Sequence, residues 1–116
     1  MKALTSIIAI GILALFFNTH TFAADTEHKL EALAHAEEAV KHGEMGHANE
    51  LLKYAEDSLE HAKAAMQEGG DAHMKKAIKQ LEEAIEHAKM DHADVATEHA
   101  KKAMKHLRQS GVRTTH

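Results

Sequence analysis

The chain has 116 residues, with 14 Lys and Arg against 18 Asp and Glu, so its formal net charge is −4. This length fits one small domain, and a negative balance without a basic patch argues against a nucleic-acid partner. With no cysteine, no proline and no tryptophan, the chain lacks a disulfide framework, a zinc ribbon and a c-type haem attachment site, and a turn-rich β-sandwich is disfavoured. Histidine, by contrast, is abundant, with 12 residues.

The first 23 residues have the pattern of a secretory signal peptide. A positive start at Lys2 is followed by an apolar run over 3–17, and small residues at Thr21 and Ala23 favour cleavage after Ala23. This run is shorter than the about 20 residues of a spanning helix, so we expect no stable membrane insertion after cleavage. The predicted domains are therefore a signal peptide over 1–23, a helical domain over 24–110 and a flexible tail over 111–116.

Four helices are predicted in the exported region, because Ala, Glu, Lys, Leu and Met dominate it. Glycines bracket a first break at 43–46, and a second break lies at 69–71, where Asp71 is a candidate N-cap. A third break lacks glycine, and there Asp91 and Asp94 are candidate caps. The predicted helices lie near 26–42, 47–67, 71–89 and 92–109.

The sequence also repeats itself with an offset of 45 residues, which matches Met45 with Met90 and Glu38 with Glu83. The matched histidines are His28 with His73, His42 with His87, His47 with His92 and His61 with His106. The chain is therefore expected to contain two copies of one helical hairpin. Amphipathic helices with short links then predict an all-α fold, an up-down-up-down four-helix bundle made of two duplicated hairpins.

Histidine recurs at every seventh residue within each helix, and ten of twelve such positions are histidine. The register positions are 28, 35 and 42, then 47, 54 and 61, then 73, 80 and 87, then 92, 99 and 106, with Tyr54 and Gln80 as the exceptions. A predicted apolar seam, including Leu30 in the first helix and Leu52 in the second, runs beside this register. The histidines are therefore expected on outer faces or grooves of the bundle and not in its core.

Carboxylates share the histidine stripe of the first helix. The stripe reads His28, Glu31, His35, Glu38 and His42, so each member lies one helical turn from the next on one face. Histidines seven residues apart are separated by about 10.5 Å along the axis, too far to share one ion comfortably, whereas a histidine and a carboxylate one turn apart are close enough. Mixed imidazole and carboxylate sites suit Cu(II), Ni(II) and Zn(II).

Antiparallel pairing offers a second way to bring ligands together, as rungs across a groove. Positions at equal height are 28 with 61, 35 with 54, and 42 with 47, and then 73 with 106, 80 with 99, and 87 with 92. Sites within one helix and rungs between helices both remain open at this point. The candidate metal ligands are His28, His35, His42, His47, His61, His73, His87, His92, His99, His106, Glu31 and Glu38.

The two hairpin turns share a pattern, His42-Gly-Glu-Met-Gly-His47 and His87-Ala-Lys-Met-Asp-His92. A thioether between two histidines could hold Cu(I). Methionine is also a common plug for the open end of a bundle, and this second interpretation is the one we expect for Met45 and Met90.

Other classes of function fit less well. A ferritin-like di-iron enzyme needs Glu-x-x-His pairs that face the core, whereas the pair Glu44 and His47 lies in a turn, so we predict no catalytic residues. A b-type haem bundle also needs core-facing ligands. A non-metal envelope protein, chaperone-like or pH-sensing, remains the alternative, and dialysis against Cu(II) with a competing chelator would distinguish it.

The mature region, with its cysteine-free histidine heptads and the two turn motifs, resembles the small metal-binding protein (SmbP) family of the bacterial periplasm. The resemblance implies a periplasmic four-helix bundle that binds several divalent ions, copper (Cu2+) foremost, and acts in metal sequestration or homeostasis. It also implies that the register histidines are the ligands, with incomplete rungs at Tyr54 and Gln80. We expect metal ions, with nickel and zinc beside copper, as partners of a monomeric chain.

Overall fold

The structure is a computed structural model, and residues 27–110 are described here. They form a helix over 27–44, called the N-terminal helix below, followed by α2 (Ala48–Gln67), α3 (Ala72–Lys89) and α4 (Ala93–Ser110). The predicted helix ends that fall within 27–110 agree with these bounds to within two residues. The expected signal peptide over 1–23 and the tail over 111–116 lie outside the described residues.

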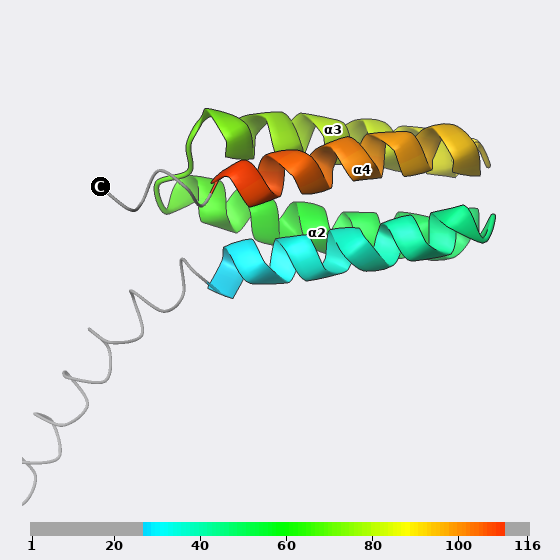
Figure 1. Cartoon of the computed structure of the whole chain (residues 1–116), viewed down its shortest axis with the longest axis horizontal. Coiled ribbons are helices and arrows are strands. Elements are labelled where there is room, and N and C mark those ends of the chain that lie inside the picture. The colour runs from blue at the N-terminus through cyan, green and yellow to red at the C-terminus, as the bar shows by residue number, and fades with distance from the viewer. Residues whose placement is uncertain (1–26, 111–116) are drawn as a thin grey trace, which may run out of the picture.

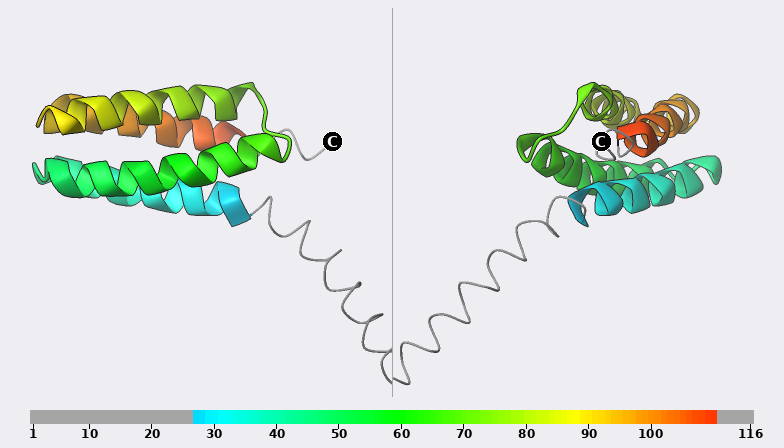
Figure 2. Two further views of the ribbon diagram at one scale, coloured as in Figure 1. Left: turned by 180° about the vertical axis from the view of Figure 1, so that it is seen from behind. Right: turned by 60° about the vertical axis from the view of Figure 1, so that its left-hand side comes forward.

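The described helices form the expected up-down-up-down bundle of two antiparallel hairpins (Figure 1). The N-terminal helix and α2 make the first hairpin, α3 and α4 make the second, and the views in Figure 2 show one hairpin lying against the other. The turns within both hairpins lie at the same end, and the link from α2 to α3 lies at the opposite end. Within 27–110, no helix is long and apolar enough to cross a membrane.

Both hairpin turns end their first helix in the same way. In the first turn, the amide of His47 donates to the carbonyl of His42 at 2.9 Å while Gly46 has φ of 80°. In the second, the amide of His92 donates to the carbonyl of His87 at 2.9 Å while Asp91 has φ of 63°. This is the Schellman motif, in which one left-handed residue closes the helix end. Asp91 is therefore part of the end of α3, and the prediction that it caps α4 is wrong.

Small residues fill the core, which consists of two clusters that each draw on all four helices. Most members are alanines, and the larger buried side chains include Leu51, Met74 and Leu81. Because alanine adds little bulk, the helices approach closely enough for the buried Ser58 hydroxyl to donate to the Ala32 carbonyl at 2.6 Å. The predicted seam is displaced accordingly: Leu30 is 61% exposed, since the N-terminal helix turns its alanines inward.

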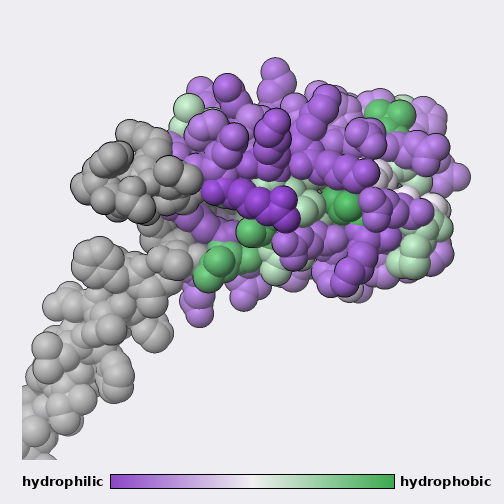
Figure 3. Space-filling view, viewed as in Figure 1, coloured by the Kyte–Doolittle hydropathy of each residue, from purple (hydrophilic) through white to green (hydrophobic). Residues whose placement is uncertain are grey.

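The face of the bundle shown in Figure 3 is mainly hydrophilic. Hydrophobic side chains occupy only small patches of the face shown, and hydrophilic residues cover the rest of it. Two ion pairs join the N-terminal helix to α4, Lys101 with Glu44 and Arg108 with Glu37, each at 3.4 Å. Exposed pairs of this kind contribute little to stability, so the fold depends on the close packing of its alanine-rich helices.

Candidate metal-binding sites

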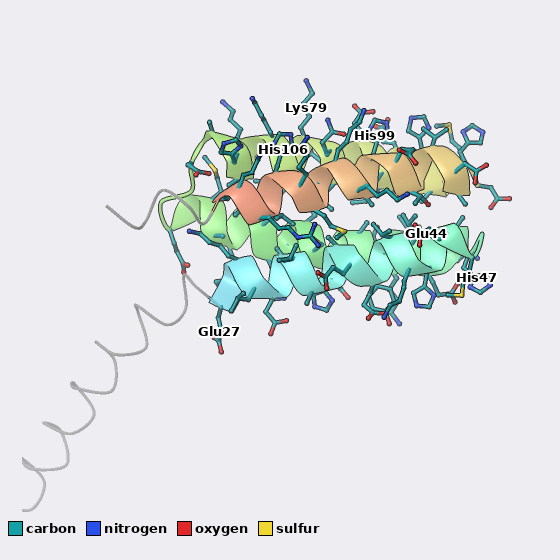
Figure 4. All side chains as sticks on the ribbon, viewed as in Figure 1. Glu27, Glu44, His47, Lys79, His99 and His106 are labelled. Atoms are coloured by element: carbon teal, nitrogen blue, oxygen red, sulfur yellow. The ribbon has the colours of Figure 1, made fainter. Side chains whose placement is uncertain are left out.

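Six side chains alternate between the two helices of the first hairpin and form a continuous row of rings. We call this row the first ladder, and its members, in order, are His28, His61, His35, Tyr54, His42 and His47. Five of the six are half-buried and His47 at the turn is exposed, so the row lies along the groove between the N-terminal helix and α2. Figure 4 shows the labelled His47 at the turn end of this hairpin.

Ring contacts connect every step of the first ladder. The centres of His28 and His61 lie 5.3 Å apart, and those of His61 and His35 lie 5.5 Å apart. Tyr54 continues the row at 6.3 Å from His35 and 5.2 Å from His42, and His42 lies 6.1 Å from His47. The pairs expected at equal height are therefore all in contact, and diagonal contacts such as His35 with His61 join one rung to the next.

The second ladder follows the same order along the second hairpin and consists of His73, His106, Gln80, His99, His87 and His92. His73 lies 5.8 Å from His106, and His87 lies 5.9 Å from His92 and 5.4 Å from His99, measured between ring centres. Gln80 replaces a ring, and its Oε1 accepts the Nδ1 hydrogen of His99 at 2.8 Å. Figure 4 shows His99 and His106 along α4, the helix that contributes alternate members of this ladder.

A carboxylate joins the first ladder from the N-terminal helix. The Nε2 atom of His35 lies 3.5 Å from Glu31 Oε1, one turn earlier on the same helix. Glu31, His35 and His61 each place one ligand atom within 4.8 Å of the other two, a spacing that could hold a single ion. This group combines both geometries left open by the sequence, because a pair within one helix is completed by a histidine from the neighbouring helix.

The second ladder contains a group of the same kind, formed by Glu83, His87 and His99, whose ligand atoms also lie within 4.8 Å of one another. Glu83 was not among the ligands predicted from the sequence. The repeat offers the signal that could have identified it, since Glu83 is matched with Glu38, which lies 3.9 Å from His42 Nε2 in the first hairpin.

The two groups lie at opposite ends of their hairpins, and the two non-histidine positions account for this. In the first hairpin Tyr54 stands where the second has His99, so the group nearest the turn is incomplete. In the second hairpin Gln80 stands where the first has His35 and Lys76 stands where it has Glu31, so the group away from the turn is incomplete. Each ladder is thereby divided into a part with three histidines and a part with two.

The separations of the rings are suitable for shared ions. An imidazole nitrogen bonds a transition metal at about 2.0 Å, which places the ring centre roughly 3.2 Å from the ion, so two rings on one ion have centres at most about 6.4 Å apart. The pairs His28 with His61, His42 with His47, His73 with His106, and His87 with His92 lie between 5.3 and 6.1 Å. All four pairs therefore meet the geometric condition for a bridging ion.

Several imidazole nitrogens in the ladders are buried without a protein partner. Among the described residues, the Nδ1 atoms of His42, His73, His87 and His106 make no hydrogen bond within the chain. Such buried polar atoms are rare in folded proteins and call for a partner such as water or a metal ion. In the remaining part of the first ladder, the Nδ1 atoms of His28 and His61 lie 3.1 Å apart, so one ring donates to the other.

His106 is tuned towards its neutral form. Burial, together with the positive charges of His73, Lys76 and Lys105, lowers the pKa of His106. Because its pKa is lowered, His106 stays neutral and keeps a lone pair for a metal ion at more acidic pH than an ordinary histidine does. Lys76 also stands where the repeat places Glu31, so the pair His73 and His106 lacks the carboxylate found in the first hairpin.

The structure places all ten predicted histidines, Glu31 and Glu38 along the two ladders, and it corrects one expectation about the neighbouring turns. Met45 and Met90 are 56% and 53% exposed, so they do not plug the end of the bundle. Ala48 and Leu51, which follow the first turn, and Ala88, near the end of α3, are buried beside the turns in place of the methionines. Glu44 and His47, the Glu-x-x-His pair weighed above for a di-iron enzyme, are likewise exposed.

Comparison with known proteins agrees with this geometry. The model of the family described as small metal-binding protein matches residues 1–110. A comparison with curated proteins finds no match. The family match spans all of the described helices and both histidine ladders. The chain therefore belongs to the small metal-binding protein family.

Proposed function

We propose that the protein is a periplasmic buffer that binds several divalent transition-metal ions, copper foremost, in metal sequestration or homeostasis. The observation that carries the proposal is the pair of histidine ladders, each with a Glu-His-His group whose ligand atoms lie within 4.8 Å of one another. Alternate ladder members come from different helices, so the folded hairpin holds the ligands close together before any ion binds. The role proposed is binding and release, with no catalytic step.

The donor set favours copper among the common divalent ions. Two imidazole nitrogens and one carboxylate oxygen form a mixed site that suits Cu(II), Ni(II) and Zn(II). For such ligands affinity rises along the first transition row to a maximum at Cu(II), so copper is expected to displace nickel and zinc. With neutral histidines and one carboxylate, each Glu-His-His group also balances part of the charge of a divalent ion.

The four parts of the ladders are expected to differ in affinity. The groups containing Glu31 and Glu83 offer three ligands and are expected to fill first. The pairs His42 with His47 and His73 with His106 offer two rings each and are expected to fill later. Ions enter and leave by ligand exchange at half-buried rings, and protons compete because only neutral imidazole binds metal.

Calorimetric titration of residues 24–116 with Cu(II), Ni(II) and Zn(II) tests the proposal. We expect two tighter sites and two weaker sites, with Cu(II) bound more tightly than Ni(II) or Zn(II) at the tighter ones. Circular dichroism on the same samples should show that copper raises the melting temperature, because binding to the folded state stabilises it. A chain that retains no metal after dialysis against Cu(II) with a competing chelator would instead be a non-metal helical protein of the envelope.

The proposed location has its own test. The small residues before Ala24 predict that the exported protein begins at that residue. Intact mass of protein recovered from the periplasmic fraction should therefore equal that of residues 24–116. A mass that retains residues 1–23 would contradict export by cleavage.

A further inference from the structure

Two methionines are exposed at the same end of the bundle, in the turns within the two hairpins. Met45 is 56% exposed and Met90 is 53% exposed, whereas Met66, Met74 and Met104 pack in or against the core. Figure 4 shows sulfur atoms at the end of the bundle where the labelled His47 lies. Neither exposed thioether contributes to the packing that holds the helices together, so their positions need another explanation.

Comparison of the two turn sequences shows which residues they share. The six residues from His42 to His47 correspond to those from His87 to His92, and only the two histidines and the methionine between them are identical. Even the left-handed position differs, with glycine at φ of 80° in one turn and aspartate at φ of 63° in the other. The left-handed position, which favours glycine, therefore accepts a different residue in the second turn. The exposed methionine, by contrast, is the same in both turns.

Each turn brings together the two histidines that flank the methionine in the sequence. In each turn the amide of the second histidine donates to the carbonyl of the first at 2.9 Å, and the methionine amide donates to that same carbonyl at 3.1 Å. The ring centres are 6.1 Å apart for His42 with His47 and 5.9 Å apart for His87 with His92. A methionine side chain that has three rotatable bonds and is more than half exposed can adapt its sulfur to an ion held between the two rings.

The donor chemistry selects a soft ion. Thioethers favour Cu(I), and two imidazoles with one thioether form a neutral set that matches a monovalent cation better than a divalent one. Within the first turn the carboxylate of Glu44 is paired with Lys101 at 3.4 Å, and the second copy has Lys89 at that position. Asp91, the carboxylate within the second turn, corresponds to Gly46 in the first, so no carboxylate position is shared by the two turns.

We propose that each hairpin turn is a Cu(I) site, formed by Met45 with His42 and His47 in the first hairpin and by Met90 with His87 and His92 in the second. This goes beyond the binding of divalent ions, since it adds a second oxidation state and two ligands outside the ladders. His87 belongs both to this turn and to the group with Glu83 and His99. In the second hairpin, Cu(I) at the turn and a divalent ion in that group therefore compete for His87.

Anaerobic titration of residues 24–116 with Cu(I), in competition with bathocuproine disulfonate, tests the proposal. The variant Met45→Leu/Met90→Leu should bind Cu(I) at least ten-fold more weakly at the turn sites, while its affinity for Cu(II) changes by less than two-fold. The matched control is Met66→Leu/Met104→Leu, which also removes two thioethers and exchanges side chains of similar volume. Circular dichroism should show that both variants are folded.

Silver(I), a monovalent soft ion that does not change oxidation state, gives a second measurement. Its addition should shift the methyl carbon resonances of Met45 and Met90 and leave that of Met74 unchanged. Equal Cu(I) affinities of wild type and the turn variant, equal losses in the turn and control variants, or silver shifts outside the turns would each overturn the proposal. Failure of the divalent function would be seen separately, as a wild-type chain that does not bind Cu(II).

Discussion

At position 80, a glutamine amide oxygen accepts the Nδ1 hydrogen of His99 at 2.8 Å. With Nδ1 protonated, Nε2 of His99 keeps its lone pair and is the nitrogen available to a metal. Hydrogen bonds of this kind fix the tautomer and orientation of a ligating histidine and raise its affinity. Gln80 therefore has a role of its own, because it orients His99 in the group formed with Glu83 and His87.

Replacement Gln80→Leu should remove this orientation while leaving all ligands present. We expect the affinity of the second-hairpin site for Cu(II) to fall about 10- to 100-fold, as for other residues that orient a ligand. Calorimetry measures the change, and Gln80→Asn, which retains the amide, should recover part of the loss. The control Gln109→Leu changes an exposed glutamine of the same hairpin. Equal affinities of wild type and Gln80→Leu would contradict this role.

Tyr54 interrupts the first ladder in a different way, since its ring stacks on His42 with centres 5.2 Å apart and planes 11° apart. The corresponding ring of the second hairpin is His99, which stacks on His87 at 5.4 Å and 9°. The variant Tyr54→His should therefore give the first hairpin a second three-ligand group, with Glu38 and His42. Calorimetry should show one additional tight Cu(II) site, and an unchanged number of tight sites would refute the equivalence of the two hairpins.

At the scale of the element, α3 depends on its N-cap. Asp71 Oδ1 accepts the amide hydrogen of Met74 at 3.0 Å and the hydroxyl of Ser110 at 2.9 Å, so one carboxylate joins the start of α3 to the end of α4. Burial raises the pKa of Asp71, but these two hydrogen bonds and the charge of His73 act against it, and the net pKa lies below its ordinary value.

The variant Asp71→Ala should lower the free energy of unfolding by about 1 kcal/mol at neutral pH, the usual effect of losing an N-cap. Because the folded pKa is depressed, this stabilisation is present above the unfolded value of about 3.9 and is lost as pH falls through the folded pKa. Urea denaturation of the metal-free chain should show the difference at pH 7 and its disappearance at the most acidic pH. Asp57→Ala, at an exposed position within α2, serves as control.

At the scale of the molecule, Gly43 marks where the first hairpin touches α4. Gly43 is buried within the last turn of the N-terminal helix, and a Cβ at this residue would overlap Thr97 Oγ1 and Leu51 Cδ1. The sequence suggested a turn glycine, but its φ is not left-handed, and the reason for glycine is the close approach of a neighbouring helix. That approach depends on three-dimensional packing, which the spacing of residues along the chain does not specify.

The variant Gly43→Ala should therefore lower the free energy of unfolding, whereas replacing a helical glycine by alanine usually raises it. Alanine in place of a helical glycine ordinarily stabilises by roughly 0.5–1 kcal/mol, whereas overpacking here should destabilise by about 1–3 kcal/mol. Thermal unfolding of the metal-free chain measures the change, and adding Thr97→Ala should recover part of the loss by removing the overlapped hydroxyl. A Gly43→Ala chain more stable than wild type would show that the hairpins are not packed this closely.

The sequence predicts much of this molecule because its repeats are regular. Heptads and the 45-residue offset locate the helices, and antiparallel pairing about each turn predicts contacts such as that of His28 with His61. The diagonal contact of His35 with His61 was not predicted, because it depends on how neighbouring rings interdigitate in the groove. The position of Glu83 beside His87 and His99 was not predicted, because the later copy of the stripe contains Lys76 and Gln80, which conceal a group that remains complete nearer the turn.

A double-mutant cycle on His35 and His61 tests whether histidines from two helices share one ion. The cycle is measured by Cu(II) calorimetry in a His99→Ala background, so that the first hairpin retains the only complete three-ligand group known within 27–110. We predict that the double variant loses less binding free energy than the sum of the single variants, since either loss already removes most of the chelate advantage. His35 with His106, in different hairpins, should be additive. Additive losses for His35 and His61, within about 0.5 kcal/mol, would contradict a shared ion.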